Sequence, residues 1–250
     1  MISIKNANEI DKMRAAGHLV GQCHELLKDA IKPGVSTLEL DTIAEKYFRD
    51  HGAIPTFLGY GGFPKSICAS INDEVVHGIP GDRRLKDGDI ISIDLGATLD
   101  GYVGDAARTH AVGKISEEAQ RLIDVTQESF FNGIVFAKEG YRLSDISHAV
   151  QEYVESNGFS VVRDYVGHGI GRQMHEDPPI PNYGKPGHGP RLVPGMCLAI
   201  EPMVNVGTYD VEVLDNDWTV VTQDGKYAAH YENTITITGK GDPEILTLCQ

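Results

Sequence analysis

The chain has 250 residues, a length that suits one large domain or two small ones. Its formal net charge of −14 at pH 7 disfavours extended nucleic-acid binding, which needs a basic face. No apolar run approaches the roughly 18 residues of a membrane span, and no long apolar segment follows the first charges, which predicts a cytoplasmic protein. The four cysteines lie far apart without CxxC spacing, which disfavours a zinc knuckle or a disulfide scaffold and fits reduced thiols.

Two helices are predicted near the start of the chain. Asn8 is expected to cap a helix that runs to about Ile31, with apolar residues near helical spacing. Ser36 and Glu39 match a capping box, which predicts a second helix that Gly52 stops. We expect the first helix to cover a sheet. The glycine- and aromatic-rich residues 53–66 that follow are expected to line a pocket or to turn a corner.

The stretch from Asp89 to Arg108 predicts a β-hairpin that brings two carboxylates onto one face. Apolar and polar residues alternate there with the period of a strand, and Asp100-Gly101 is a strong two-residue turn signal. Counting back from the turn makes Asp94 and Asp105 diagonal neighbours, about 7 to 8 Å apart before their side chains converge. If buried, such a pair must protonate, pair with a cation or bind metal; on an exposed face both acids would sit in water.

The second half of the chain repeats the order of two helices followed by strands. Ser116 is expected to open a helix that runs to about Ala137, and Ser144 a second helix that Asn157-Gly158 closes. Matching residues then recur 106 or 107 positions apart: Lys32 and Lys138, Gly34 and Gly140, Gly52 and Gly158, Leu85 and Leu192, Gly88 and Gly195, Ile93 and Ile200, and Asp94 and Glu201.

We interpret this offset as an internal duplication within a single catalytic domain over residues 1–250, with repeats at approximately 8–110 and 116–238. The expected class is α+β, with two helix-helix-strand halves. The duplication places Glu201 where Asp94 sits in the first half.

The second half also supplies three candidate metal or acid-base residues. His168 lies in a glycine- and proline-rich region, residues 166–195, which predicts loops around a site. Glu201 follows a buried strand, and Glu232 lies in an alternating segment, residues 228–238. Together with Asp94 and Asp105 they make four carboxylates and one imidazole.

Four negative charges match two divalent cations, and two-metal clamps are a recurrent device of hydrolases. A site this rich in oxygen favours manganese, iron or cobalt over structural zinc. Each residue alone also has an ordinary interpretation, such as a surface acid or a solvated histidine in a turn.

The sequence resembles the type I methionine aminopeptidases, metallopeptidases with the pita-bread fold. The motifs that carry this resemblance are FLGYGGFPKSICASINDEVVHGIP, DIISIDLGATLDGYVGDAART, YVGHGIGRQMHEDPPIPNYG, GMCLAIEPMV and YENTITIT, and the resemblance covers nearly the whole chain. It implies a pseudo-two-fold repeat of the two halves around a curved antiparallel sheet. The implied activity is removal of the N-terminal methionine from nascent proteins and peptides.

The resemblance also implies a dinuclear centre that could contain cobalt, manganese, iron, zinc or nickel. Asp94 would bind one metal ion, Asp105 and Glu232 both, and His168 the other, with Glu201 also coordinating. As catalytic residues, Glu201 would be the general base and proton shuttle, His175 would stabilise the oxyanion together with a metal ion, and His77 would contact the scissile amide. The sequence does not decide whether one monovalent cation binds near Asn72.

For the methionine side chain the resemblance implies an apolar slot that suits an unbranched thioether. Its residues would be Tyr60, Phe63, Cys68, His77, Met174, His175 and Trp218. The chain departs from the bacterial pattern at three positions: Phe57 stands where a cysteine is common, Phe63 replaces a tyrosine, and Met174 replaces a phenylalanine. Trp218 could equally be a half-buried strand residue.

The sequence disfavours three alternatives to this function. An X-Pro aminopeptidase or prolidase would share the five ligands but usually has an additional N-terminal domain, for which this chain has no room. A non-catalytic ribosome- or RNA-associated relative should have lost metal ligands, whereas all five are present here. A structural metal protein is disfavoured because five ligands for two ions leave open coordination positions for water. Type II enzymes have a helical insertion between the last two acidic ligands, Glu201 and Glu232, which lie close together here.

The implied partners are nascent polypeptide N-termini, with a transient ribosome contact. We expect a cytoplasmic monomer without membrane association.

Overall fold

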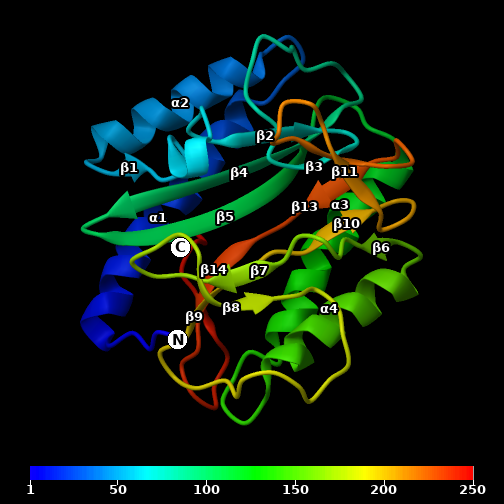
Figure 1. Cartoon of the computed structure of the whole chain (residues 1–250). Helices are drawn as coiled ribbons and strands as arrows, with labels where there is room; N and C mark the ends of the chain where they lie inside the picture. The colour runs from blue at the N-terminus through cyan, green and yellow to red at the C-terminus, as the bar shows by residue number, and fades with distance from the viewer. Residues whose placement is uncertain (250) are drawn as a thin grey trace.

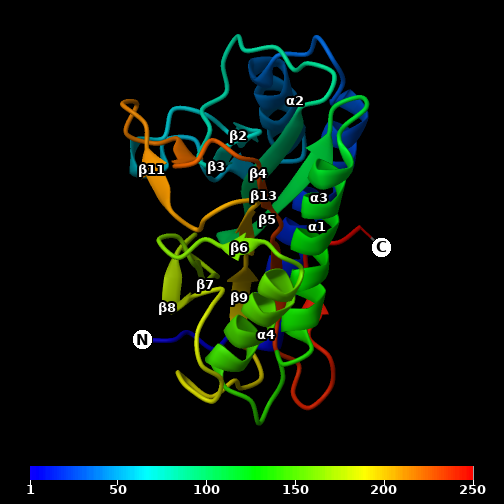
Figure 2. The same cartoon turned by 90° about the vertical axis from the view of Figure 1, so that its right-hand side faces the viewer.

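Two pairs of helices pack against antiparallel sheets in the computed structural model, which describes residues 1–249. The first pair is α1 (Ala7–Ala30) and α2 (Thr37–Asp50), and the second is α3 (Glu117–Ile134) and α4 (Leu143–Ser156). Figure 1 shows α1 and α2 behind the strands of the first half and α3 and α4 behind those of the second. Helices α1 and α3 lie on the same side of the strands, as Figure 2 shows.

The strands of the first half are β1 (Ile54–Pro55), β2 (Cys68–Ile71), β3 (Glu74–Val76), β4 (Ile90–Leu99) and β5 (Tyr102–Ala111), with a 3-10 turn η1 (Tyr60–Gly62) after β1. The second half contains β6 (Ser160–Val161), β7 (Gly167–Gly169), β8 (Glu176–Ile180), β9 (Cys197–Ile200), β10 (Met203–Asn205), β11 (Val211–Val213), β12 (Val220–Thr222), β13 (Ala228–His230), β14 (Asn233–Thr236) and β15 (Glu244–Ile245). The α+β class is therefore confirmed.

The predicted hairpin forms strands β4 and β5 with the expected register. Leu99 pairs with Tyr102, and further back Asp94 pairs with Ala107. Asp105 is only 2% exposed, so the alternative in which both acids sit in water is wrong. The apolar residues that alternate with Asp94 pack against α1 and α2 in the core of the first half, since burial of apolar surface drives this contact.

The helix boundaries follow the cap residues. Asn6, not Asn8, caps α1, because its side chain accepts a hydrogen bond from the Glu9 amide while the Glu9 carboxylate accepts one from the Asn6 amide. Helix α4 begins at Leu143 rather than at Ser144, because the Asp145 carboxylate accepts a hydrogen bond from the Arg142 amide. The capping box predicted for α2 is confirmed.

The helix ends differ slightly from the prediction. Helix α3 ends three residues before the predicted Ala137, and α1 ends at Ala30, one residue before Ile31.

Two segments of the second half depart from the prediction. The region expected to form loops contains strands β7 and β8, which pair with each other and bring His168 into a sheet. The alternating segment 228–238 is two strands, because β13 pairs with β10 whereas β14 pairs with β9. Between them the Glu232 backbone exchanges hydrogen bonds with Ala107 of β5, at 2.9 and 3.3 Å.

The chain thus has two helices followed by strands twice in succession. The internal duplication and the single-domain boundaries remain predictions. Within the described residues no helix combines the length and apolar character of a membrane span.

Candidate metal centre

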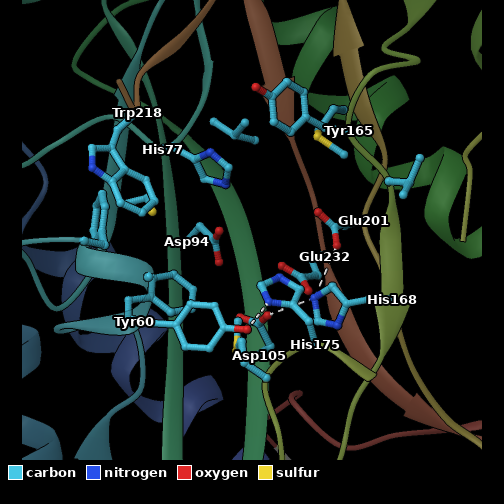
Figure 3. Close-up of a pocket in the computed structure, with 18 residues that line it drawn as sticks. Tyr60, His77, Asp94, Asp105, Tyr165, His168, His175, Glu201, Trp218 and Glu232 are labelled. Carbon is cyan, nitrogen blue, oxygen red and sulfur yellow. Dashed lines mark hydrogen bonds and ion pairs between the residues drawn. The ribbon is translucent and has the colours of Figure 1, made fainter. Parts of the chain in front are cut away.

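A cavity of about 240 Å³ brings together every side chain predicted to act in the site (Figure 3). Both halves of the chain line it. The predicted residues in its wall are Tyr60, Phe63, Cys68, His77, Asp94, Asp105, His168, Met174, His175, Glu201, Trp218 and Glu232. The structure thus brings the predicted residues together in one cavity, and their roles remain predictions.

Three of these residues form a buried group that could bind a metal ion. Asp105 lies on β5, His168 on β7, and Glu232 between β13 and β14. Each offers one ligand atom, and these atoms all lie within 4.8 Å of one another. The three residues are 2%, 7% and 1% exposed, so solvent does little to screen their charges.

Asp94 and Glu201 stand beside this group. Asp94 projects from β4 next to Asp105, and Glu201 directly follows β9. The Nε2 atom of His168 lies 3.6 Å from Asp105 Oδ2 and 3.6 Å from Glu201 Oε1. The second oxygen of Glu201 lies 3.8 Å from His230 Nε2, so two imidazoles flank this carboxylate.

The chemistry of this donor set fits divalent metal. Asp94 Oδ1, Asp105 Oδ1 and Glu232 Oε1 are buried and accept no hydrogen bond from the described residues, although buried oxygens normally find a partner. Burial and the neighbouring carboxylates raise the pKa of Asp94 and of Glu232 well above the usual range. Protons or cations must therefore neutralise the cluster, and divalent ions can do so while satisfying the free oxygens.

The orientation of His168 also suits a metal ligand. Its Nδ1 atom lies 2.9 Å from the carbonyl oxygen of Gly169, which can only accept, so Nδ1 donates and Nε2 faces the carboxylates. Burial lowers the pKa of His168, but its contact with Asp105 and the charge of Glu201 outweigh this effect and raise the pKa to about 9. A metal ion beside Nε2 would replace this proton.

His175 lies at the rim of the cavity and contacts both His168 and Tyr60. Its ring centroid is 4.3 Å from that of His168, and its Nδ1 is 2.7 Å from the Tyr60 hydroxyl. Desolvation of the ring and the neighbouring His168 lower the pKa of His175 to about 4, although the residue as a whole remains exposed. The imidazole is therefore neutral at pH 7.

His77 adopts a left-handed backbone conformation with a φ of 60°, which is rare for a residue other than glycine. Its ring meets the edges of two aromatic rings, with centroids 5.6 Å from Tyr165 and 6.4 Å from Trp218. Burial lowers its pKa, so this imidazole is also neutral. Strain of this kind is typical of positions that a functional site constrains.

Apolar and aromatic side chains cover the rest of the cavity. Phe63 and Trp218 pack edge to face with ring centroids 5.1 Å apart, and Cys68 and Met174 belong to the same buried cluster. Trp218 lies in the turn before β12 rather than on a strand. The sequence did not single out Val76, Tyr165, Val166 and Met203, which also line the cavity. Their only sequence signal is adjacency to predicted residues within the quoted motifs.

Comparisons with known proteins find relatives that match nearly the whole chain. The family model described as Metallopeptidase family M24 matches residues 11–239. The methionine aminopeptidase of Clostridium acetobutylicum is 64% identical over 251 residues, covering 100% of both chains. Methionine aminopeptidase 1 of Bacillus subtilis is 60% identical over 241 residues, covering 96% of this chain and 97% of that protein.

Solved structures separate two kinds of relative. The methionine aminopeptidase of Rickettsia prowazekii superposes with a TM-score of 0.97 at 46% identity, covering 99% of this chain and 100% of that one. The Xaa-Pro dipeptidase of Bacillus anthracis superposes with a TM-score of 0.77 at 24% identity and shares only the fold. The superposition covers 98% of this chain but only 61% of that dipeptidase.

Proposed function

The chain belongs to metallopeptidase family M24 and has its pita-bread fold, and we propose that it is a methionine aminopeptidase that removes the N-terminal methionine of nascent proteins and peptides. The observation that carries the proposal is the buried group of Asp105, His168 and Glu232 at the base of an apolar cavity. High identity to methionine aminopeptidases over the full chain supports this substrate rather than a proline-containing one.

We propose that five residues hold two divalent ions. Asp94 would help to hold one ion, Asp105 and Glu232 would contribute to both, and His168 would help to hold the other, with Glu201 as a further ligand. Cobalt, manganese, iron, zinc and nickel all suit a set of oxygen ligands with one imidazole. Such ions lower the pKa of bound water and polarise a carbonyl group.

Glu201 would act as general base and proton shuttle. Its carboxylate lies between His168 and His230, at 3.6 and 3.8 Å, which keeps it directed into the cavity. A carboxylate held in this way can take a proton from the attacking water and deliver it to the leaving amine. Burial raises the pKa of this carboxyl group to about 8, which makes its carboxylate form a stronger base.

Two neutral histidines would stabilise charge on the substrate. His175, at the rim, can donate a hydrogen bond to the oxygen that becomes negative as the carbonyl is attacked. His77 faces the same cavity from the segment after β3 and would contact the scissile amide.

The apolar wall would select methionine. Five apolar and aromatic residues line this part of the cavity: Tyr60, Phe63, Cys68, Met174 and Trp218. Aromatic and sulfur groups make favourable contacts with a thioether. An unbranched side chain can enter this slot, whereas a β-branched one would meet the aromatic edges. The substitutions at Phe57, Phe63 and Met174 keep the wall apolar.

Further proposals concern the cellular setting. Nascent N-termini are made in the cytoplasm, which supports cytoplasmic residence and a transient contact with the ribosome. The four cysteines of the described chain are free, which fits a reducing compartment. We also propose that the chain acts as a monomer. A monovalent cation near Asn72 remains a prediction.

The test is mass spectrometry of a peptide that begins Met-Ala-Ser, incubated with the protein and manganese or cobalt. Loss of the first methionine alone is expected, with no turnover in EDTA. A matched peptide that begins Ala-Pro should stay intact.

Cleavage of the Ala-Pro peptide instead would assign the chain to the proline peptidases of the family. Inertness towards both peptides in the presence of metal would favour a non-catalytic binding protein.

A further inference from the structure

We infer that Tyr60 is a positioning residue that fixes which nitrogen of His175 carries the proton. The Tyr60 hydroxyl lies 2.7 Å from His175 Nδ1, and the two rings are tilted by 42° with centroids 5.2 Å apart. The residues come from opposite halves of the chain and meet at the rim of the cavity (Figure 3). The expected effect of Tyr60 on catalysis rests on the proposed function. The tautomer of His175 can be measured whether or not that function is correct.

The glycine-rich turn delivers Tyr60 to this position. Gly59 and Gly61, on either side of Tyr60, have φ values of 83° and 57°, which L residues rarely adopt. Gly61 also lies beside the Trp218 ring, because a Cβ atom at this position would be in ordinary van der Waals contact with the ring at 3.5 Å. The turn therefore holds the tyrosine ring between the tryptophan side of the cavity and His175.

The backbone of His175 is anchored independently by the next residue. One oxygen of Glu176 accepts hydrogen bonds from the amides of Arg172 and Gln173, at 2.9 and 3.2 Å. The other oxygen accepts a hydrogen bond from Lys5 Nζ at 2.7 Å. The loop before β8 is thus fixed, and the remaining freedom of His175 is the orientation and tautomer of its ring.

The tautomer decides what His175 can do. A neutral imidazole has one N–H group and one lone pair. When the Tyr60 hydroxyl donates to Nδ1, the proton lies on Nε2 and can be donated to a substrate oxygen. In the opposite arrangement Nδ1 donates to Tyr60 and Nε2 offers only a lone pair, which would repel a developing negative charge. The first arrangement is therefore the productive one.

The experiment compares the full chain, loaded with diamagnetic zinc, with its Tyr60→Phe variant. Long-range ¹H–¹⁵N correlation spectra of the ¹⁵N-histidine-labelled protein report the tautomer, and His175→Ala identifies the signal. We expect the Nε2–H tautomer in the parent protein and a mixture of both tautomers in Tyr60→Phe. Phenylalanine keeps the aromatic wall, so kcat should fall about tenfold while KM stays within about twofold.

Tyr47→Phe is the matched control, because it also deletes a hydroxyl hydrogen bond, to Gln22 at 2.8 Å, far from the cavity. It should change neither the His175 signal nor kcat. In a His175→Ala background Tyr60→Phe should cause no further loss of kcat.

An Nδ1–H tautomer in the parent protein, or an unchanged tautomer in Tyr60→Phe, would overturn the inference. Equal kcat losses with and without His175 would show that Tyr60 acts on the substrate directly. If the parent protein cleaves no methionine, the proposed function fails, and the spectra still decide the tautomer.

Discussion

The side chain of His168 is oriented by a contact with its own neighbour in the chain. Donation from Nδ1 to the Gly169 carbonyl leaves Nε2 facing Asp105 and Glu201. The two carboxylates that face His168, Asp105 and Glu201, have different surroundings. Asp105 belongs to the group whose ligand atoms lie within 4.8 Å, whereas Glu201 stands next to it between two imidazoles. Metal binding and proton transfer should therefore be separable by mutation.

We predict that Asp105→Asn loses metal, because it removes a charge from the centre of the cluster, and that it consequently loses activity. Glu201→Ala should retain more metal than Asp105→Asn but lower kcat by at least about 10²-fold, the contribution of a general base. Metal content by atomic absorption and kcat on the Met-Ala-Ser peptide check both expectations. Full activity of either variant would contradict the assignment.

At the scale of elements, the amino-terminal segment anchors the loop that carries Met174 and His175. Lys5 and Glu176 form an ion pair at 2.7 Å with side chains 4% and 15% exposed, and the Lys5 amide bonds to the Gly195 carbonyl. This pair joins residues that are 171 positions apart in sequence. Removal of one partner of a buried pair leaves the other charge without compensation.

Lys5→Met should therefore lower the free energy of unfolding by about 3 kcal/mol. It should also raise KM, because the loop would no longer hold Met174 against the slot. Denaturant unfolding and steady-state kinetics measure the two effects. The control is Lys46→Met, which removes an exposed pair with Asp50 on α2 and should change stability by less than about 1 kcal/mol. Equal effects of the two variants would show that the Lys5 pair has no anchoring role.

At the scale of the whole molecule, several histidines are held neutral inside the fold. Burial, with Arg108 and Lys28 nearby, lowers the pKa of His110 from 6.5 to about 4. In the unfolded chain this imidazole takes up a proton near pH 6.5, whereas in the folded chain it does so only near pH 4. The unfolded state thus binds more protons between these values, and stability falls as the pH is lowered through this window.

His110→Gln should flatten this part of the stability profile. The parent protein should lose on the order of 2 kcal/mol more than the variant between pH 6.5 and pH 4. Thermal or denaturant unfolding at a series of pH values gives both curves, and His51→Gln, at an exposed helix end, should track the parent. Parallel curves for the parent and His110→Gln would contradict the shift.

Features set by neighbouring residues could be predicted from the sequence. The hairpin register, the cap of α2 and the alternation around Asp94 depend on turn chemistry and on side-chain periodicity, which act over a few residues. The cap of α1 could also have been predicted, because Asn6 and Glu9 have the same capping-box spacing as Ser36 and Glu39, whereas Asn8 is not followed by such a partner.

The sequence by itself determined the family, and it predicted the five ligands and the apolar slot, whose roles remain proposals. Tertiary structure alone decided how distant segments meet: the hydrogen bonds of Glu232 with Ala107, and the contacts of Tyr60 with His175 and of Lys5 with Glu176. The physical reason is that such contacts depend on how two sheets pack, and no signal within a few residues encodes the separation of residues more than a hundred positions apart.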